Sequence, residues 1–142
     1  MSQHRPTIPA VLRRQVVLRS GNRCEYCGLS QLGQEATFHV DHVIPVAAGG
    51  ATDLENLALA CVSCSLSKAA RLTAPDPTTG QEIRLFNPRT DSWSDHFWWD
   101  GIVVVPKTAI GRATSLRLKM NRALALLIRE EEFAIGRHLD QG

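Results

Sequence analysis

The spacing of apolar residues in the first half of the chain changes from helical to strand-like. Over residues 7–20, apolar side chains recur about every four positions, which predicts a helix that Gly21 can end. Residues 37–44 are rich in β-branched and aromatic side chains and predict a strand that closes at Pro45. A second, shorter strand or extended loop is expected before Asn56.

The second half alternates between helical and extended patterns. The apolar pattern over residues 57–70 predicts a short helix that begins near the second cysteine pair and ends around residues 68–71, and residues 81–86 and 102–105 predict strands. The strongest helical pattern covers residues 113–129, with a basic face opposite an apolar one. The apolar face comprises Leu116, Met120, Ala123, Leu124 and Leu127. These elements predict an α+β fold whose strand-plus-helix C-terminal extension begins near residue 75.

Length and composition favour one soluble globular domain over residues 1–142. A chain of 142 residues that is 44% hydrophobic and 21% charged can bury one core of ordinary size. Its longest apolar stretch, residues 123–128, is too short to cross a membrane, and residues 1–10 lack the apolar stretch of a signal peptide. We therefore expect a cytoplasmic protein without a membrane segment.

The formal charge of +2 is too small to indicate a nucleic-acid partner, but the charge is unevenly distributed. Residues 5–23, which include the predicted N-terminal basic helix, and residues 107–122 contain several Arg or Lys residues and no acid. Such stretches either face solvent or contact phosphates through nonspecific, salt-sensitive attraction. The candidate nucleic-acid contacts are Arg13, Arg14, Lys68, Arg112, Lys119 and Arg122.

The four cysteines form two C-x-x-C pairs, Cys24 with Cys27 and Cys61 with Cys64. In a reducing cytoplasm, two close pairs are metal ligands more often than disulfides. Four thiolates suit tetrahedral Zn²⁺ and leave no open position for substrate, so the predicted zinc site is structural. A redox role is a weaker alternative, because neither pair lies in a βαβ pattern. Four unrelated buried cysteines are the remaining alternative.

Several short motifs follow one another between and around the cysteine pairs. They are Asp41-His42-Val-Ile-Pro45, Gly49-Gly50, Asn56-Leu57, Cys61-x-x-Cys64 and Lys68. In this order they closely resemble the HNH endonuclease family over residues 24–70. The resemblance implies a ββα-metal finger, in which two strands and a helix hold one catalytic ion and the zinc site pins both ends. A motif so small buries little surface, which explains the need for a structural metal.

The resemblance also assigns roles to three residues. His42 matches the general base that activates water, and an imidazole with a pKa near ~6.5 suits that role at neutral pH. Asp41 matches the carboxylate that binds the catalytic Mg²⁺ or Mn²⁺. Asn56 matches the middle residue of the motif, whose amide fixes the loop and orients the histidine. The implied reaction is hydrolysis of DNA phosphodiester bonds, by cleavage or nicking.

One position departs from the family pattern. Family members usually carry His or Asn directly after the last cysteine as a second ligand to the catalytic metal, and here that residue is Ser65. Three interpretations are open: Ser65 binds the ion directly or through water, His39 or His96 substitutes, or metal binding and activity have been lost. Strand alternation places His39 on the same side as Asp41. It places Asp41 and His42 on opposite sides unless the strand end twists or bulges.

The aromatic residues near His96 are open to two interpretations. Trp93, Phe97, Trp98 and Trp99 either pack in the core or stack on nucleic-acid bases, and core packing is favoured because they lie between two predicted strands. For the whole chain the leading hypothesis is a metal-dependent endonuclease acting on double-stranded DNA, with RNA an open alternative. The rival hypotheses are a zinc-stabilised DNA-binding module without activity and a protein-interaction scaffold, which would leave Asp41 and His42 unexplained.

Overall fold

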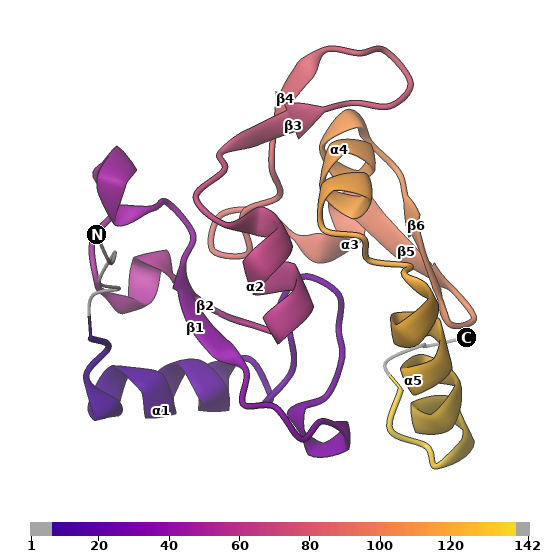
Figure 1. Ribbon diagram of the computed structural model, residues 1–142, viewed down its shortest axis with the longest axis horizontal. Coiled ribbons are helices and arrows are strands. Elements are labelled where there is room, and N and C mark those ends of the chain that lie inside the picture. Colours follow the sequence, from indigo (N-terminus) through magenta and orange to yellow (C-terminus); the bar gives the residue numbers. More distant parts are fainter. Residues whose placement is uncertain (1–6, 139–142) are drawn as a thin grey trace.

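In the computed structural model, which describes residues 7–138, helices surround three separate two-stranded antiparallel sheets (Figure 1). The helices are α1 (Ala10–Arg19), α2 (Val62–Lys68), α3 (Trp93–His96), α4 (Ala109–Arg117) and α5 (Ala123–Ala134). The paired strands are β1 (His39–His42) with β2 (Leu57–Ala60), β3 (Thr73–Pro75) with β4 (Glu82–Arg84), and β5 (Phe97–Asp100) with β6 (Val103–Pro106). The mixed architecture confirms the predicted α+β class. Two predictions fall partly outside the described residues: the basic stretch that begins at Arg5, and residues 1–10, which were tested for a signal peptide.

The first predicted helix is confirmed as α1, although it begins at Ala10, after Pro9, and not at residue 7. Val16 is buried in the core, and Gly21 adopts a positive φ of 65° just beyond the helix, a conformation that glycine adopts without strain. The Arg19 guanidinium donates to the carbonyl oxygens of Leu54 at 2.8 Å and Leu57 at 2.7 Å. The last turn of α1 therefore anchors the start of β2.

The short helix predicted to begin near the second cysteine pair is confirmed as α2, Val62–Lys68, whereas the segment Leu57–Ala60 is a strand that the sequence pattern did not predict. All four β2 residues are buried, and a short, wholly apolar run does not distinguish a buried strand from a helix. The segment before Asn56, expected to be a shorter strand or an extended loop, is a loop that contains two 3-10 turns, Val46–Ala48 and Leu54–Asn56. The partner of β1 instead follows Asn56, which produces the order strand, loop, strand, helix.

The C-terminal extension packs against the first cysteine pair. The Trp93 indole donates to the Tyr26 carbonyl oxygen at 2.9 Å, and Arg89 forms an ion pair with Glu25, a residue between Cys24 and Cys27. Trp93, Phe97 and Trp99 form a contiguous aromatic group at centroid distances of 5.0 and 5.2 Å, which confirms core packing for these three. Trp98 differs, because 48% of its surface is exposed.

The predicted single helix over residues 113–129 is wrong, because the chain breaks between α4 and α5. Lys119 adopts a positive φ of 51°, and the Asn121 side chain bonds to both the N–H and the C=O of Val104, at 2.9 and 2.7 Å. These bonds to β6 replace the helical hydrogen bonds that the sequence pattern favours. A tertiary contact therefore overrides local helix propensity.

The predicted apolar face of that helix is also wrong. Leu124 and Leu127 of α5 are each more than 60% exposed, as is Leu116 of α4, whereas Arg129 is only 1% exposed. The Arg129 guanidinium donates to the carbonyl oxygens of Met120 at 2.6 Å and Ile102 at 3.1 Å, and it lies over the Trp99 ring. Burying an arginine is costly unless hydrogen bonds compensate for the lost water, and these carbonyls accept from its two terminal nitrogens.

We predict that the loop between β3 and β4 depends on an ionised Asp76. Bonds from Arg112, at 2.9 and 2.8 Å, hold the pKa of this buried carboxyl well below its usual range. A lowered folded-state pKa stabilises the fold above the unfolded pKa of ~3.9, and that stability is lost as pH falls through the folded-state value. Asp76→Asn should therefore speed amide hydrogen exchange of the Thr79–Gln81 turn at pH 7. Equal exchange rates in the variant and the wild type would contradict this prediction.

Candidate functional site

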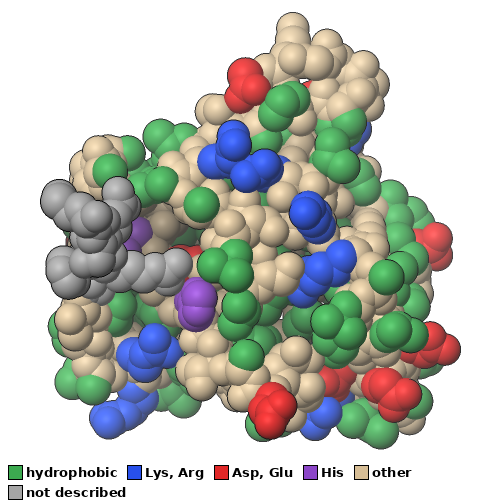
Figure 2. All heavy atoms as spheres, viewed as in Figure 1, with side chains coloured by type: hydrophobic (Ala, Val, Ile, Leu, Met, Phe, Trp, Pro, Cys, Tyr) green, Lys and Arg blue, Asp and Glu red, His purple; other side chains and the backbone are tan. Residues whose placement is uncertain are grey.

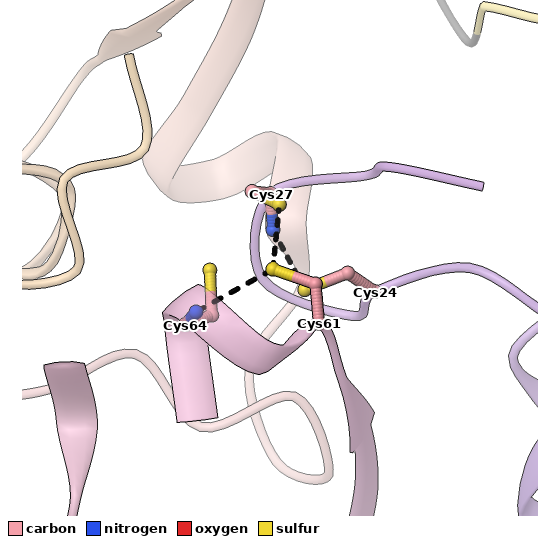
Figure 3. Close-up of side chains that lie close together, drawn as sticks. All are labelled: Cys24, Cys27, Cys61 and Cys64. Atoms are coloured by element: carbon pink, nitrogen blue, oxygen red, sulfur yellow. Dashed lines mark hydrogen bonds between the residues drawn. The ribbon is translucent and has the colours of Figure 1, made fainter. Parts of the chain in front are cut away.

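The four cysteines converge in the structure as the sequence predicts (Figure 3). Cys24 and Cys27 lie in the turn that follows α1, whereas Cys61 and Cys64 lie at the start of α2. All four Sγ atoms lie within 4.8 Å of one another, and those of Cys27 and Cys61 are 3.7 Å apart. Tetrahedral zinc–sulfur bonds of about 2.3 Å place sulfurs about 3.8 Å apart. This cysteine cluster therefore fits a zinc site.

Both cysteine pairs use the same local geometry. The amide N–H of Cys27 donates to Cys24 Sγ, and that of Cys64 donates to Cys61 Sγ, each at 3.4 Å. The first turn continues through Gly28, whose φ of 80° disfavours any residue with a Cβ. Amide donors aimed at the sulfurs favour the thiolate form, which is the form that binds a metal.

The cysteine cluster is closed by two arginines of the C-terminal extension. Burial raises the pKa of the Cys24 thiol well above its usual value, so a thiolate at this position needs a cation beside it. Four thiolates around Zn²⁺ carry a net charge of 2−. Arg122 lies 3.6 Å from Cys61 Sγ, and Arg129 donates to the Cys27 carbonyl oxygen at 3.3 Å. The two guanidinium groups can balance that charge, so Arg122 has a structural contact besides its predicted nucleic-acid contact.

Strand β1 and helix α2 bring His39 and Ser65 into contact. The His39 Nδ1 lies 2.7 Å from the Ser65 Oγ, and Ser65 is only 2% exposed. Val40 points into the core, so alternation along β1 places His39 and Asp41 together on the other face. Three of the predicted metal-site residues therefore share the side of β1 against which α2 packs.

His42 ends β1, where its Nε2 lies 2.8 Å from the Thr52 hydroxyl. Asn56 holds the intervening loop, because its amide bonds to both the N–H and the C=O of Ile44 and to the carbonyl oxygen of Ala51, each at 2.9 Å. The Asn56 side chain therefore bonds to the loop backbone, whereas the Thr52 side chain is in hydrogen-bond contact with His42. Sequence reasoning missed Thr52, because it occupies no position of the motif.

The Gly49-Gly50 turn permits this loop to close tightly. A Cβ at position 50 would lie 1.8 Å from the Ile44 carbonyl oxygen and 2.7 Å from the Asn56 amide nitrogen. Such distances exclude every residue except glycine at this position. The second glycine of the turn is therefore required by the close approach that Asn56 fixes.

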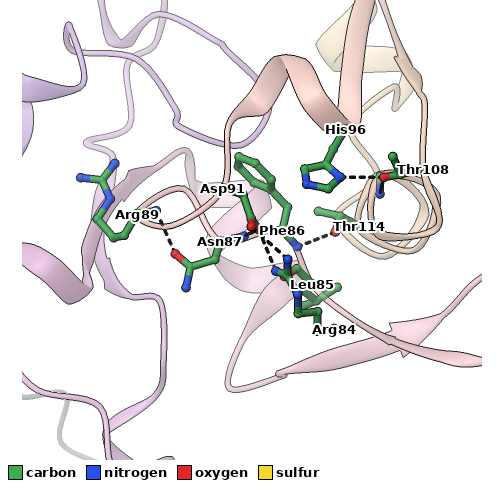
Figure 4. A network of polar contacts seen from close by, with 10 residues as sticks. Arg84, Leu85, Phe86, Asn87, Arg89, Asp91, His96, Thr108 and Thr114 are labelled. Carbon is green, nitrogen blue, oxygen red and sulfur yellow. Dashed lines mark hydrogen bonds and ion pairs between the residues drawn. The ribbon is translucent and has the colours of Figure 1, made fainter.

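His96 belongs to a different part of the molecule (Figure 4). Its Nδ1 lies 2.7 Å from the Thr108 hydroxyl, and its ring packs edge-on against Phe86 at a centroid distance of 6.0 Å. Thr108 in turn caps α4 by accepting from the Gly111 amide. These contacts do not favour the proposed substitution of His96 at the catalytic metal, and they fit a histidine that packs within the extension.

The predicted nucleic-acid contacts divide into buried and exposed residues. Lys68 is only 3% exposed and donates to the Val43 carbonyl oxygen at 3.0 Å, so its burial does not favour the predicted nucleic-acid contact. Arg112 forms an ion pair with Asp76, and the Arg13 guanidinium lies 3.4 Å from the Phe38 carbonyl oxygen. Arg14 and Lys119 are exposed. The exposed pair is therefore better placed to meet a polyanion.

Basic side chains nevertheless gather near β1. Figure 2 shows histidine side chains on the face that displays β1 and α2. Lys and Arg side chains lie over α1 on one side of them and between α2 and α4 on the other. Positive charge on both sides of a site is the distribution expected for binding a polyanion.

Comparison with known families identifies the central segment. The sequence model of the HNH endonuclease family matches residues 24–71, which contain the cysteine cluster, β1, β2 and α2. This match confirms the predicted resemblance and indicates a nuclease or DNA-binding function. No curated protein matches the chain.

Among residues 7–138, no helix is both long enough and apolar enough to cross a membrane.

Proposed function

We propose that the HNH domain at residues 24–71 hydrolyses DNA phosphodiester bonds with the help of a divalent metal ion, and that Zn²⁺ in the cysteine cluster supports it. The observation that carries the proposal is the placement of His39 and Asp41 on one face of β1, with His42 at the end of the strand, where its ring meets Thr52 of the following loop. That strand is held between the cysteine cluster and the loop that Asn56 fixes. The family match alone would equally suit a DNA-binding module.

In the proposed reaction His42 accepts a proton from the attacking water. The water oxygen forms a bond to phosphorus while the bond from phosphorus to the 3′-oxygen breaks. Asp41 would hold Mg²⁺ or Mn²⁺, which when bound stabilises negative charge on the phosphate and on the departing oxygen. The Thr52 hydroxyl orients the His42 ring, and Asn56 keeps Thr52 in place through the loop. Hydrogen bonds already fix the positions of His42, Thr52 and Asn56.

Plasmid nicking tests the proposal. Zinc-loaded protein incubated with supercoiled DNA and Mg²⁺ or Mn²⁺ should produce nicked or linear product, and the same reaction in EDTA should not. A matched reaction with RNA distinguishes the two nucleic acids. The absence of metal-dependent cleavage would refute the proposed nuclease activity.

Ser65 favours the rival hypothesis of a DNA-binding module, since a hydroxyl is a weaker metal ligand than the usual His or Asn. That module would shift DNA in a gel without cutting it. A gel shift at low salt separates it from the scaffold hypothesis, which expects no DNA affinity.

We predict that Thr52→Val slows cleavage by about fivefold to tenfold. The variant keeps the shape of the side chain but removes the hydroxyl, and a net hydrogen bond of about 1 to 1.4 kcal/mol corresponds to a fivefold to tenfold effect on rate. Thr52→Ser retains the hydroxyl and should keep most of the rate. The measurement is kcat for plasmid nicking, with zinc content as the check on folding. Equal rates for Thr52→Val and Thr52→Ser would show that the hydroxyl does not position His42.

A further inference from the structure

The contact between His39 and Ser65 occurs where the chain departs from the HNH pattern. We infer that His39, and not Ser65, supplies the second protein ligand of the catalytic ion, and that the resulting imidazole and carboxylate pair selects Mn²⁺ over Mg²⁺. Ser65 is a positioning residue that holds the His39 ring. The inference rests on the proposed nuclease function, because the ion is the one that the reaction requires.

The backbone of β1 sets the spacing of the two ligands. His39 and Asp41 pair in register with Ala60 and Ala58 of β2, so this part of the strand is regular. Two residues along a strand are about 6 to 7 Å apart and point to the same face. One ion with bonds of about 2 Å to each side chain bridges that separation. The buried Val40 between them fixes which face they share.

The Ser65 hydroxyl selects the ring nitrogen that would bind the ion. When the Nδ1–H of His39 donates to Ser65 Oγ across the observed 2.7 Å, the imidazole lone pair is on Nε2. Histidine ligands in metal sites commonly donate their other N–H in this way, which fixes the tautomer and the ring orientation. Ser65 itself is only 2% exposed and contacts His39. This contact gives the hydroxyl a role at a position where other family members carry a metal ligand.

The donor set determines which metal is favoured. Imidazole nitrogen is a good ligand for first-row transition ions, whereas Mg²⁺ prefers oxygen donors and retains its waters. An Asp and His pair therefore binds Mn²⁺ more tightly than Mg²⁺. An Asp paired with a serine hydroxyl, by contrast, would offer only oxygen and show no such selectivity.

Manganese binding without DNA tests the inference. Zinc-loaded protein is titrated with Mn²⁺ while the EPR signal of free Mn²⁺ is followed, and pulsed EPR detects nitrogen coupling to the bound ion. His39→Ala should remove the coupling and weaken Mn²⁺ binding by about 100-fold or more. Ser65→Ala should keep the coupling and weaken binding by about tenfold, as for other residues that orient a metal ligand. His96→Ala, which alters a histidine bound to Thr108, is the matched control and should change neither.

A conservative variant distinguishes loss of the metal ligand from loss of folding. His39→Gln keeps a polar group near Ser65 but offers an amide oxygen, so the preference for Mn²⁺ over Mg²⁺ should shrink by about tenfold while zinc content is unchanged. Nitrogen coupling that survives in His39→Ala, or Ser65→Ala binding that falls as far as His39→Ala binding, would overturn the inference. If Mn²⁺ binds through His39 but plasmid is not cleaved, the proposed nuclease activity is refuted and the ligand assignment is not. Cleavage with wild-type Mn²⁺ binding in His39→Ala would refute only this ligand assignment.

Discussion

Cys61→Ser is expected to abolish zinc binding and unfold the domain at room temperature. Cys61 directly follows β2 and caps α2, and its Sγ lies 3.7 Å from Cys27 Sγ, so one substitution disturbs both cysteine pairs. Zinc contributes about 10 kcal/mol or more to folding in small zinc domains, whereas whole domains are stable by only about 5 to 15 kcal/mol. The loss therefore exceeds what the remaining core of a chain this size supplies.

The measurements are zinc content by mass spectrometry and near-ultraviolet circular dichroism, which reports the packing of Trp93 against the first cysteine turn. Ser63→Ala changes a residue between Cys61 and Cys64 without removing a thiolate and should leave both signals unchanged. A Cys61→Ser protein with wild-type melting temperature and one bound zinc would show that the cysteine cluster does not support the fold.

The parts of the structure that the sequence predicts well depend on local chemistry. The four cysteines sit in short turns at fixed spacing, so their convergence follows once β1 and β2 pair. Helix α1 follows from an apolar repeat with a glycine after it. In both cases the residues that decide the structure are neighbours along the chain, and a spacing pattern reports on neighbours.

The parts that the sequence predicts poorly depend on contacts between distant residues. Arg129 is buried because carbonyl oxygens at residues 27, 102 and 120 surround it, and nothing in a helical wheel indicates those partners. Lys68 is buried because the Val43 carbonyl accepts from it across α2 and β1. In the sequence, Arg129 falls on the basic face of the predicted helix and Lys68 is a candidate nucleic-acid contact, so both patterns favour exposed side chains. The exceptions are the charged side chains that a tertiary contact satisfies.

The candidate site shows the same division. The motif identifies Asp41, His42 and Asn56, but it does not identify Thr52, which the loop brings to within 2.8 Å of His42. Nor does the sequence alone decide between Ser65 and His39, since the contact between them appears only when α2 packs on β1. The motif residues are the basis of the proposed reaction. The residues around them would set the geometry of the proposed site and its preference for a metal.

His42→Ala is expected to reduce metal-dependent nicking by about 100-fold to 10,000-fold, the range over which a positioned general base contributes to rate. The substitution removes the only group assigned to accept the proton of water, so no change in metal concentration should restore the rate. Its effect should therefore exceed that of Thr52→Val, which retains the imidazole and disturbs only its orientation. The measurement is the single-turnover rate on supercoiled plasmid at saturating Mn²⁺.

Two further observations distinguish lost chemistry from lost structure. Because His42 and Asp41 have separate roles, His42→Ala should bind Mn²⁺ and DNA as the wild type does and retain its zinc. Added imidazole should recover part of the rate, since the cavity left by the ring admits a small base. Undiminished nicking in His42→Ala would assign the base to another group, even if the protein proves to be a nuclease. Lost Mn²⁺ binding in that variant would instead place His42 among the metal ligands, beside Asp41 on the same strand.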